Sequence, residues 1–371
     1  MLNRFVAMFF VELYTLFHKG RISVETMKAV LKKEPGPGAE YMEAPVPKPG
    51  PRDVLVQVIA TSICGTDLHI YKWDPWSASR IKPPMIFGHE FVGEIVEVGK
   101  DVKAVKAGDY VSAETHIVCG HCVTCRTGQA HICLNLEILG IDRDGCFAEY
   151  VVIPEENAWV TDRSIPPEIA TIQEPLGNAV HATLIEDITG KSLAVFGCGP
   201  IGLFSIAVAK ASGASAIFAV EVNPLRLSLA EKLGAHHLIN PTDIDPVTYI
   251  LDETKGIGVD VFLEMSGAAE AIDKGMKVVR NGGRVSFLGI PPGPVTFDFA
   301  ENIIFKGIRM YGINGRLMFD TWFKMQSLLE REDFDPSPII THKFPLSEIH
   351  RAMALIENKE AAKIVLFPHE I

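Results

Sequence analysis

The sequence lacks the features that mark nucleic-acid-binding and repeat proteins. Acidic residues outnumber basic ones by 46 to 35, the formal net charge is −11, and basic residues form no stripe along the chain. Nucleic acid and anionic membrane surfaces are therefore not expected among its partners. The sequence also has no internal repeat and no low-complexity tract, so a repeat architecture is not expected.

The sequence contains no uninterrupted apolar run that is long enough to cross a bilayer. Residues Met1 to Phe17 are rich in Phe, Val and Leu, but this stretch is short and Glu12 interrupts it. No small-residue cleavage site follows it, so neither secretion nor membrane insertion is expected. We interpret residues 1–26 as an N-terminal extension and expect the folded part to begin near Met27.

The cysteine count argues against a disulfide framework. The chain has seven cysteines, an odd number, and four of them fall between Cys119 and Cys133. This clustering, without a secretory signature, favours reduced thiols that bind metal in the cytoplasm.

The length of 371 residues favours two domains. The first part of the chain predicts a mixed-β catalytic domain over residues 27–178, because short β-rich runs alternate there with Gly and Pro. We interpret the Gly- and Pro-rich segment from Pro35 to Pro51 as a connector. The β-rich runs are Met27–Leu31, Val54–Ile59, Phe91–Val98 and Gly140–Val152.

Cys64, His89 and Glu90 offer a thiolate, an imidazole and a carboxylate, a ligand set that suits zinc. A catalytic zinc needs three protein ligands and an open position. Thr66 and His69 follow the cysteine at offsets of two and five, and a hydroxyl beside an imidazole can move a proton away from a metal-bound alcohol. Each residue alone would more simply belong to the core, so the hypothesis depends on the rest of the chain.

Four closely spaced cysteines are typical of a structural zinc site: Cys119, Cys122, Cys125 and Cys133. Four thiolates can surround one tetrahedral zinc and leave no open position. An iron–sulfur cluster is the alternative, but the last cysteine lies too far along the chain for the common ferredoxin pattern and lacks its proline. We expect the neighbouring His121 and His131 to be solvated loop residues.

The middle of the chain has the pattern of a dinucleotide-binding fold. The apolar run Ser192–Phe196 predicts a buried strand, and a glycine-rich loop leads from it into a helix. The loop residues that approach the cofactor are Gly197, Gly199, Ile201 and Gly202. Glu221 ends the next predicted strand, where a carboxylate binds ribose hydroxyls and repels a 2′-phosphate. The pattern therefore predicts NAD rather than NADP.

Predicted strands and helices alternate as far as Gly312, which indicates a doubly wound parallel sheet over residues 179–316. In such folds, ligands bind beyond the carboxyl ends of the strands. Arg226 could pack over an adenine ring, or it could be a surface helix residue. The residues expected to line the nicotinamide are Leu288, Gly289, Ile290, Ile313 and Asn314.

Residues 317–371 are too few for a core of their own, and we expect them to return to the first domain. The pattern predicts helices over Met318–Arg331 and Ser347–Asn358. Between them, Pro336 to Pro345 is expected to be a crossing segment, and Lys363–Phe367 is the last predicted strand.

The chain resembles the zinc-dependent medium-chain dehydrogenases from Met27 to its end. The resemblance implies an α/β fold with a GroES-like mixed-β catalytic domain and a doubly wound parallel Rossmann domain. Residues 1–26 fall outside it. The matching segments are Ile63–Tyr71, Gly88–Glu90, His116–Cys122, Glu174–His181, Ile304–Gly307 and Gly315–Arg316.

The resemblance also implies residue roles and a reaction. It supports the zinc ligands and relay pair argued above, and it makes Glu174 a further zinc ligand or a proton-relay acid. It implies one catalytic and one structural Zn²⁺ per subunit of a cytoplasmic homotetramer. The implied reaction oxidises the 3-hydroxyl of L-threonine to L-2-amino-3-oxobutanoate and passes a hydride to NAD.

Some alternatives remain open on the sequence. A polyol dehydrogenase of the sorbitol or butanediol type would share the zinc, the fold and the hydride chemistry. A zinc-free reductase or an inert binding relative should lack Cys64, His89 or the four-cysteine loop. Arg316 could bind a substrate carboxylate or the NAD pyrophosphate, and His116 could contact the substrate or pack.

Overall fold

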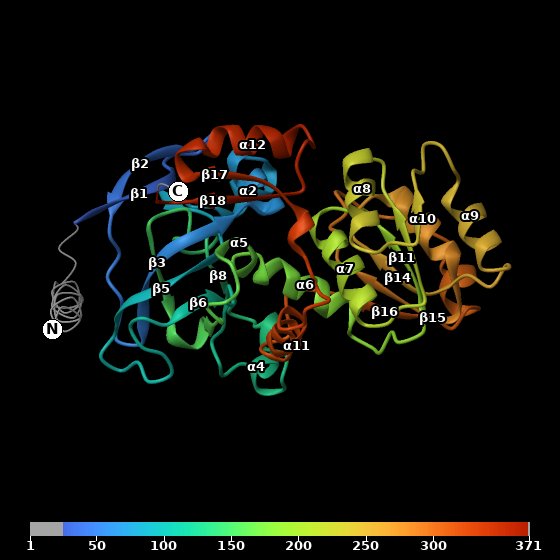
Figure 1. The fold of residues 1–371 in the computed structure, drawn as a ribbon, viewed down its shortest axis with the longest axis horizontal. Helices are drawn as coiled ribbons and strands as arrows, with labels where there is room; N and C mark the ends of the chain where they lie inside the picture. Colours follow the sequence, from blue (N-terminus) through green and yellow to red (C-terminus); the bar gives the residue numbers. More distant parts are fainter. Residues whose placement is uncertain (1–24, 370–371) are drawn as a thin grey trace, which may run out of the picture.

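A computed structural model of the protein describes residues 25–369 and shows two lobes joined by helix α6 (Gln173–Thr183) (Figure 1). The predicted N-terminal extension lies outside the described residues, except for Glu25 and Thr26. Within residues 25–369, every helix is too short or too polar to cross a bilayer.

The first lobe is a mixed-β structure, as the sequence predicts. Its largest sheet has seven strands in the order β10-β6-β5-β3-β18-β17, with β9 also paired to β3. The strands from the first half of the chain are β3 (Asp53–Ser62), β5 (Glu90–Val98), β6 (Tyr110–Ala113), β9 (Tyr150–Pro154) and β10 (Ala158–Val160). Two small sheets flank it, built from β1 (Thr26–Lys32), β2 (Glu40–Pro45) and β4 (Met85–Ile86), and from β7 (His116–Ile117) and β8 (Glu137–Ile138).

The last part of the chain, residues 340–369, lies in the first lobe, where Figure 1 shows it in red beside β3, whereas Trp322, Met325 and Leu328 pack in an apolar core with α6 and the second lobe. Strand β18 (Lys363–Phe367) pairs antiparallel with the end of β3 and parallel with β17 (Ile340–Pro345). Helices α11 (Asp320–Leu329) and α12 (Ile349–Glu357) precede these two strands in turn. This pairing brings the start of β18 beside the strand that leads to Cys64.

The structure contradicts two predicted connectors. The segment from Pro35 to Pro51 contains β2, and the segment from Pro336 to Pro345 contains β17. Both strands lie at the edge of their sheets. An edge strand needs fewer apolar residues and tolerates proline, so its sequence signal is weak.

The strand predicted over Gly140–Val152 is also shorter than expected and begins only at Tyr150. The preceding loop packs its glycines against the backbone of Gly88. A Cβ on Gly140 or Gly145 would lie 2.2 or 2.0 Å from the Gly88 oxygen, so only glycine fits. This loop therefore supports the turn that leads into His89.

The second lobe contains a six-stranded parallel sheet in the order β13-β12-β11-β14-β15-β16, which confirms the predicted doubly wound fold. Its strands are β11 (Ser192–Phe196), β12 (Ala216–Val220), β13 (His237–Ile239), β14 (Val259–Glu264), β15 (Val279–Phe287) and β16 (Arg309–Gly312). The connecting helices include α7 (Pro200–Ala211), α8 (Pro224–Lys232), α9 (Pro246–Glu253) and α10 (Ala269–Val278). Alternate side chains of β11 enter two different apolar cores, so helices cover both faces of the sheet.

Candidate active site

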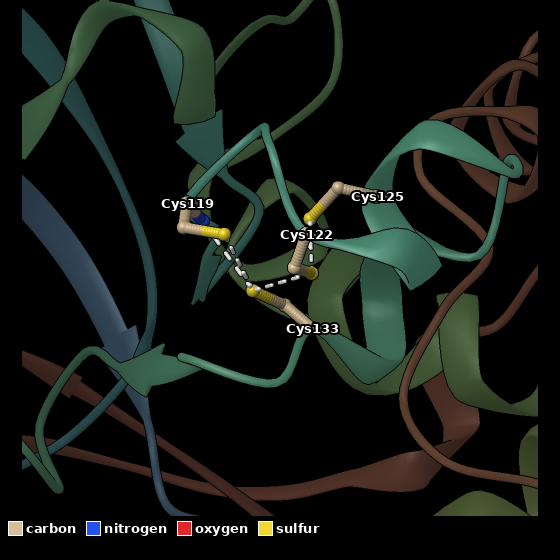
Figure 2. A group of neighbouring side chains, drawn as sticks. All are labelled: Cys119, Cys122, Cys125 and Cys133. Carbon is tan, nitrogen blue, oxygen red and sulfur yellow. Dashed lines mark hydrogen bonds between the residues drawn. The ribbon is translucent and has the colours of Figure 1, made fainter.

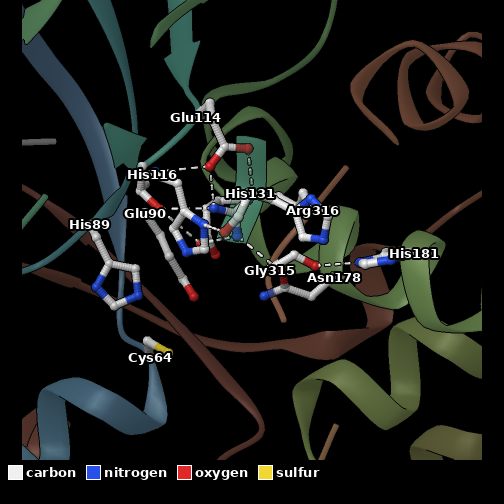
Figure 3. Close-up of polar contacts among 12 residues, drawn as sticks. Cys64, His89, Glu90, Glu114, His116, His131, Asn178, His181, Gly315 and Arg316 are labelled. Carbon is white, nitrogen blue, oxygen red and sulfur yellow. Dashed lines mark hydrogen bonds and ion pairs between the residues drawn. The ribbon is translucent and has the colours of Figure 1, made fainter. Parts of the chain in front are cut away.

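Two segments of the first lobe converge on one point beside the long sheet. Strand β3 leads into Cys64, the N-cap of helix α2 (Gly65–Lys72), while His89 directly precedes β5. The antiparallel pairing of β3 with β5 places Ser62 opposite Glu90. The ligand atoms of Cys64, His89 and Glu90 consequently lie within 4.8 Å of one another (Figure 3).

The chemistry of this site fits a zinc ion. A thiolate, an imidazole and a carboxylate converge at a place where His89 and Glu90 are buried. Burial alone would lower the pKa of His89, yet the nearby Cys64 and Asp67 raise that pKa to about 10. The surroundings therefore favour a positive charge at this point, as a cation site requires.

Asp67 was not predicted as a site residue. Its buried carboxylate accepts a hydrogen bond from the backbone N–H of Cys64 at 2.8 Å, and its other oxygen lies 3.8 Å from Nδ1 of His89. Burial raises the pKa of Asp67 to about 6. A carboxylate behind a metal-binding histidine orients the ring. Its place three residues after the helix N-cap was the signal that sequence reasoning overlooked.

Glu90 already has a cationic partner in the described structure. Lys363 donates to both of its carboxylate oxygens, at 2.7 and 2.5 Å, and Ser62 donates a further hydrogen bond. Glu90 and Lys363 are both fully buried. Nothing in the sequence pointed to Lys363, because it lies 273 positions from Glu90 along the chain.

Thr66 and His69 lie on the helix that Cys64 begins. The hydroxyl oxygen of Thr66 is 3.7 Å from the sulfur of Cys64. His69 follows Thr66 by three positions, which places both residues on one face of α2. Because the His69 side chain is 61% exposed, the pair leads from the buried cluster toward solvent.

Glu174 lies near this cluster but outside the set of converging ligand atoms. It pairs with Arg316 and accepts a hydrogen bond from Thr115 at 3.2 Å. Arg316 is itself buried, with every N–H donor used (Figure 3). Its partners are Glu114, Thr115, Glu174 and Asn178. The structure therefore supports neither suggested role of Arg316, since no donor is left for a substrate carboxylate or a pyrophosphate.

Three histidines surround this buried ion pair. The ring of His116 contacts Gly315 and hydrogen-bonds the carbonyl oxygen of His131 at 3.1 Å. Burial and the charge of Arg316 lower the pKa of His116 to about 4. His131 is buried, contrary to the expectation of a solvated residue, because it packs edge-on against His181 of α6.

The four cysteines of the loop gather around a single point (Figure 2). A tetrahedral zinc with bonds of about 2.3 Å separates its sulfurs by roughly 3.8 Å. The recorded separations are 3.4 Å for Cys122–Cys125, 3.8 Å for Cys122–Cys133 and 3.5 Å for Cys119–Cys133. The set fits a closed tetrahedral zinc site. His121 in this loop is exposed, as expected.

The glycine-rich loop joins β11 to α7 in the second lobe. Gly197 has φ +93°, and a Cβ on Gly202 would lie 2.0 Å from the Gly197 oxygen. Both positions therefore require glycine. Gly199 is the N-cap of α7, and Ile201 lies in the first turn. The loop thus presents a helix N-terminus suited to a pyrophosphate.

Glu221 lies directly after β12 and points back at this loop. Its carboxylate accepts hydrogen bonds from the backbone N–H groups of Cys198 (2.8 Å), Val222 (2.9 Å) and Asn223 (3.0 Å). Arg226 approaches to 4.0 Å. The acid is thereby fixed where a ribose would follow the pyrophosphate.

The residues predicted to line the nicotinamide lie beyond the carboxyl ends of β15 and β16. Leu288 and Gly289 donate to the carbonyl oxygen of Glu264 at 3.0 and 3.1 Å, while Ile313 donates to Phe287 at 2.9 Å. Ile290 and Asn314 are exposed. Glu264, which was not predicted, also accepts hydrogen bonds from Ser266 and Gly267 through its side chain, and so shapes this edge.

Comparisons with known proteins agree with this geometry. Residues 50–163 match the alcohol dehydrogenase GroES-like domain, and residues 200–331 match the zinc-binding dehydrogenase family. A curated L-threonine 3-dehydrogenase from Symbiobacterium thermophilum is 53% identical over 93% of this chain and 98% of its own length. The one from Pyrococcus horikoshii is 52% identical over 92% of this chain and 98% of its own length.

Solved structures share the fold at lower identity. The 2R,3R-butanediol dehydrogenase from Bacillus subtilis has a TM-score of 0.84 and 31% identity, and the match covers 92% of this chain and 100% of that one. A zinc-binding dehydrogenase from Sinorhizobium meliloti bound to NADP has a TM-score of 0.85 and 30% identity, covering 92% and 99%. The chain therefore belongs to the zinc-dependent medium-chain dehydrogenases, in the family of the L-threonine 3-dehydrogenases.

Proposed function

We propose that this chain oxidises the 3-hydroxyl of L-threonine to L-2-amino-3-oxobutanoate and transfers a hydride to NAD. The observation that carries the proposal is the convergence of Cys64, His89 and Glu90 on one point. The names of the curated relatives supply the substrate. Each turnover transfers one hydride to the nicotinamide and releases one proton to solvent.

We assign two zinc ions to the chain. One would be held by Cys64, His89 and a carboxylate, and the other by the four cysteines of the loop. When bound, the first zinc supplies the Lewis acidity that lowers the pKa of an alcohol, and the nicotinamide supplies the hydride acceptor. The nearby carboxylate of Glu174 is one of the groups that raise the pKa of His89, so Glu174 remains our candidate for a relay acid.

The polypeptide contributes positioning and a proton path. Thr66 would take the proton of the substrate hydroxyl and pass it to His69, whose exposed side chain releases it to solvent. The glycine-rich loop and Glu221 would hold the cofactor, and Glu221 favours NAD over NADP. Both nicotinamide and substrate would then be fixed by rigid strand ends.

Oligomerisation and location are further parts of the proposal. We assign a homotetramer in the cytoplasm, which is what the family resemblance implies. Among residues 25–369, strand β16 forms one edge of the parallel sheet, and this supports self-association because an edge strand can extend the sheet into a second copy. Apolar side chains exposed on and near it are Ile290, Phe299, Ile304, Phe305 and Met310. Light scattering after gel filtration would measure the subunit number, and a monomer would refute it.

A polyol dehydrogenase is the second candidate, and the fold shared with the butanediol dehydrogenase favours it. The test is NADH absorbance with L-threonine, sorbitol and butanediol side by side, on protein whose zinc content has been measured. We expect turnover to be most efficient with threonine. A higher kcat/KM with either polyol would replace the threonine assignment, and absence of turnover with all three would refute the proposed chemistry.

A further inference from the structure

The turn after helix α2 brings a carboxylate back to His69. Oδ2 of Asp74 lies 2.6 Å from Nδ1 of His69. Within the described part of the chain, the hydrogen bonds of the His69 ring involve Nδ1 and not Nε2. The rings of His69 and Trp76 form a T-shaped pair, with centroids 6.2 Å apart. One ring nitrogen is therefore held and the other is free.

Asp74 is itself held in place by the next helix. It is the N-cap of α3 (Pro75–Arg80), and its Oδ1 accepts a hydrogen bond from the backbone N–H of Ser77 at 2.9 Å. The hydroxyl of Ser77 lies 2.8 Å from Oδ1 of Asp74 and 2.6 Å from the carbonyl oxygen of His69. One carboxylate thus caps a helix with one oxygen and binds His69 with the other.

The turn that carries Asp74 is anchored on both sides. Trp73 ends α2 in the left-handed conformation, with φ 59°, and the ammonium group of Lys32 lies 5.0 Å from its ring centroid. At the far end of α3, Arg80 forms a two-pronged ion pair with Asp142 at 2.8 and 2.6 Å. These contacts restrict the freedom of Asp74 relative to His69.

We propose that Asp74 is a positioning residue for the relay: it accepts the Nδ1 proton of His69 and so leaves Nε2 with the lone pair that receives the substrate proton. In a neutral imidazole, one nitrogen donates and the other accepts, so the partner of Nδ1 decides which nitrogen can take a proton. Nε2 then gives that proton to water, and Asp74 stays ionised throughout. The inference rests on the proposed function.

The neighbouring charged groups have partners of their own. On α2, Lys72 pairs with Glu357 of α12 at 2.8 Å. Tyr71 hydrogen-bonds His350 of α12 at 2.7 Å. Partial burial works against the ionised form of Asp74, but hydrogen bonds from Ser77 and His69 lower its pKa below the usual value. Because Lys72 and Tyr71 have partners on α12 and the pKa of Asp74 is lowered, Asp74 is the anion that faces His69.

The test uses Asp74→Asn in the zinc-loaded enzyme. Asn caps a helix as well as Asp does, so α3 is retained. Its amide oxygen would stay on Ser77, and its NH₂ group would face Nδ1 of His69, which moves the ring proton to Nε2. We expect kcat to fall about tenfold, less than the full loss of a general base because water reaches the exposed ring. The affinity for NAD should not change, and added imidazole should restore turnover.

Two further variants separate this role from a structural one. Asp74→Ser also keeps a capping residue but is too short to reach His69, and it should lose the same activity and regain it with imidazole. Ser79→Ala removes an exposed hydroxyl that donates to the carbonyl oxygen of Trp76 in the same helix, and it leaves the Asp74–His69 contact, so its kcat should stay near that of the wild type.

The inference and the proposed function fail in different ways. Wild-type kcat in both Asp74 variants would overturn the inference, and so would a loss that imidazole does not restore or that Ser79→Ala reproduces. A wild-type enzyme with no alcohol turnover would instead overturn the proposed function itself. If the wild type preferred a polyol, the same variants would be compared with that substrate.

Discussion

Lys363 donates to both carboxylate oxygens of Glu90, and the two side chains meet in a site that excludes solvent. The same carboxylate belongs to the cluster that fits zinc. A metal ion and an ammonium group therefore compete for one anion. The C-terminal strand, through Lys363, thus influences a site built from the first half of the sheet.

This relationship predicts how Lys363→Met behaves with and without zinc. Removing one partner of a buried ion pair leaves an unpaired charge, so the zinc-free variant should lose about 3–5 kcal/mol of unfolding free energy. Zinc should restore part of that loss, because the metal replaces the missing cation. Chemical denaturation of both forms measures the effect.

The control for this prediction is Lys343→Met, which removes an exposed lysine paired with Glu168. An exposed ion pair contributes about 0–1 kcal/mol, so this variant should unfold almost like the wild type. If zinc raised the unfolding free energy of Lys363→Met no more than that of the wild type, the result would contradict the role of Glu90 at the zinc site.

The four-cysteine site predicts a different phenotype from the catalytic cluster. Cys133→Ser should bind one zinc fewer and lower the melting temperature by roughly 5–10 °C, as a structural metal contributes folding free energy. Cys64→Ser is the matched variant: it should lose turnover while it retains NAD binding and most of its stability. Calorimetry with elemental analysis would compare the two. Equal stability losses would contradict the separation of roles.

Glu221→Ala should weaken the preference for NAD over NADP. The variant loses a carboxylate that would bind the ribose, and a hydrogen bond to a charged group contributes about 1.5–3 kcal/mol. We therefore expect kcat/KM for NAD to fall about tenfold or more, while NADP is used no worse than before. Glu270→Ala, which removes an exposed acid on α10, is the control for the change in net charge. An unchanged cofactor ratio would refute the ribose role.

The sequence predicted best those elements that carry strong local patterns. Strands β11 and β18 match their predicted bounds, and the apolar side chains of β11 are buried on both sheet faces. Cys64, His89 and Glu90 could be found because few residue types bind zinc. Their assignment as ligands stays a prediction until metal is measured.

The parts that could not be predicted depend on contacts between distant segments. Lys363 reaches Glu90, and Arg316 reaches Glu114 across 202 positions, so neither pair leaves a spacing signal. From the sequence alone, Arg316 could bind a substrate carboxylate or the NAD pyrophosphate, because an arginine without a visible partner suggests that it binds an anionic ligand. Only the fold shows that two carboxylates of the protein itself, Glu114 and Glu174, already neutralise it.

His116 should make stability depend on pH between about 6.5 and 4. The folded pKa of about 4 lies below the unfolded value of 6.5, so the unfolded chain binds more protons in this range. The stabilisation from burying a neutral ring is complete above pH 6.5 and is lost as the pH falls toward 4. This shift corresponds to a change in unfolding free energy on the order of 3 kcal/mol.

His116→Gln should therefore show a flatter profile of stability against pH than the wild type, while His350→Gln, at an exposed position, should follow the wild type. Urea unfolding at several pH values measures the difference at each pH, and parallel profiles for His116→Gln and the wild type would show that the pKa of His116 does not fall on folding.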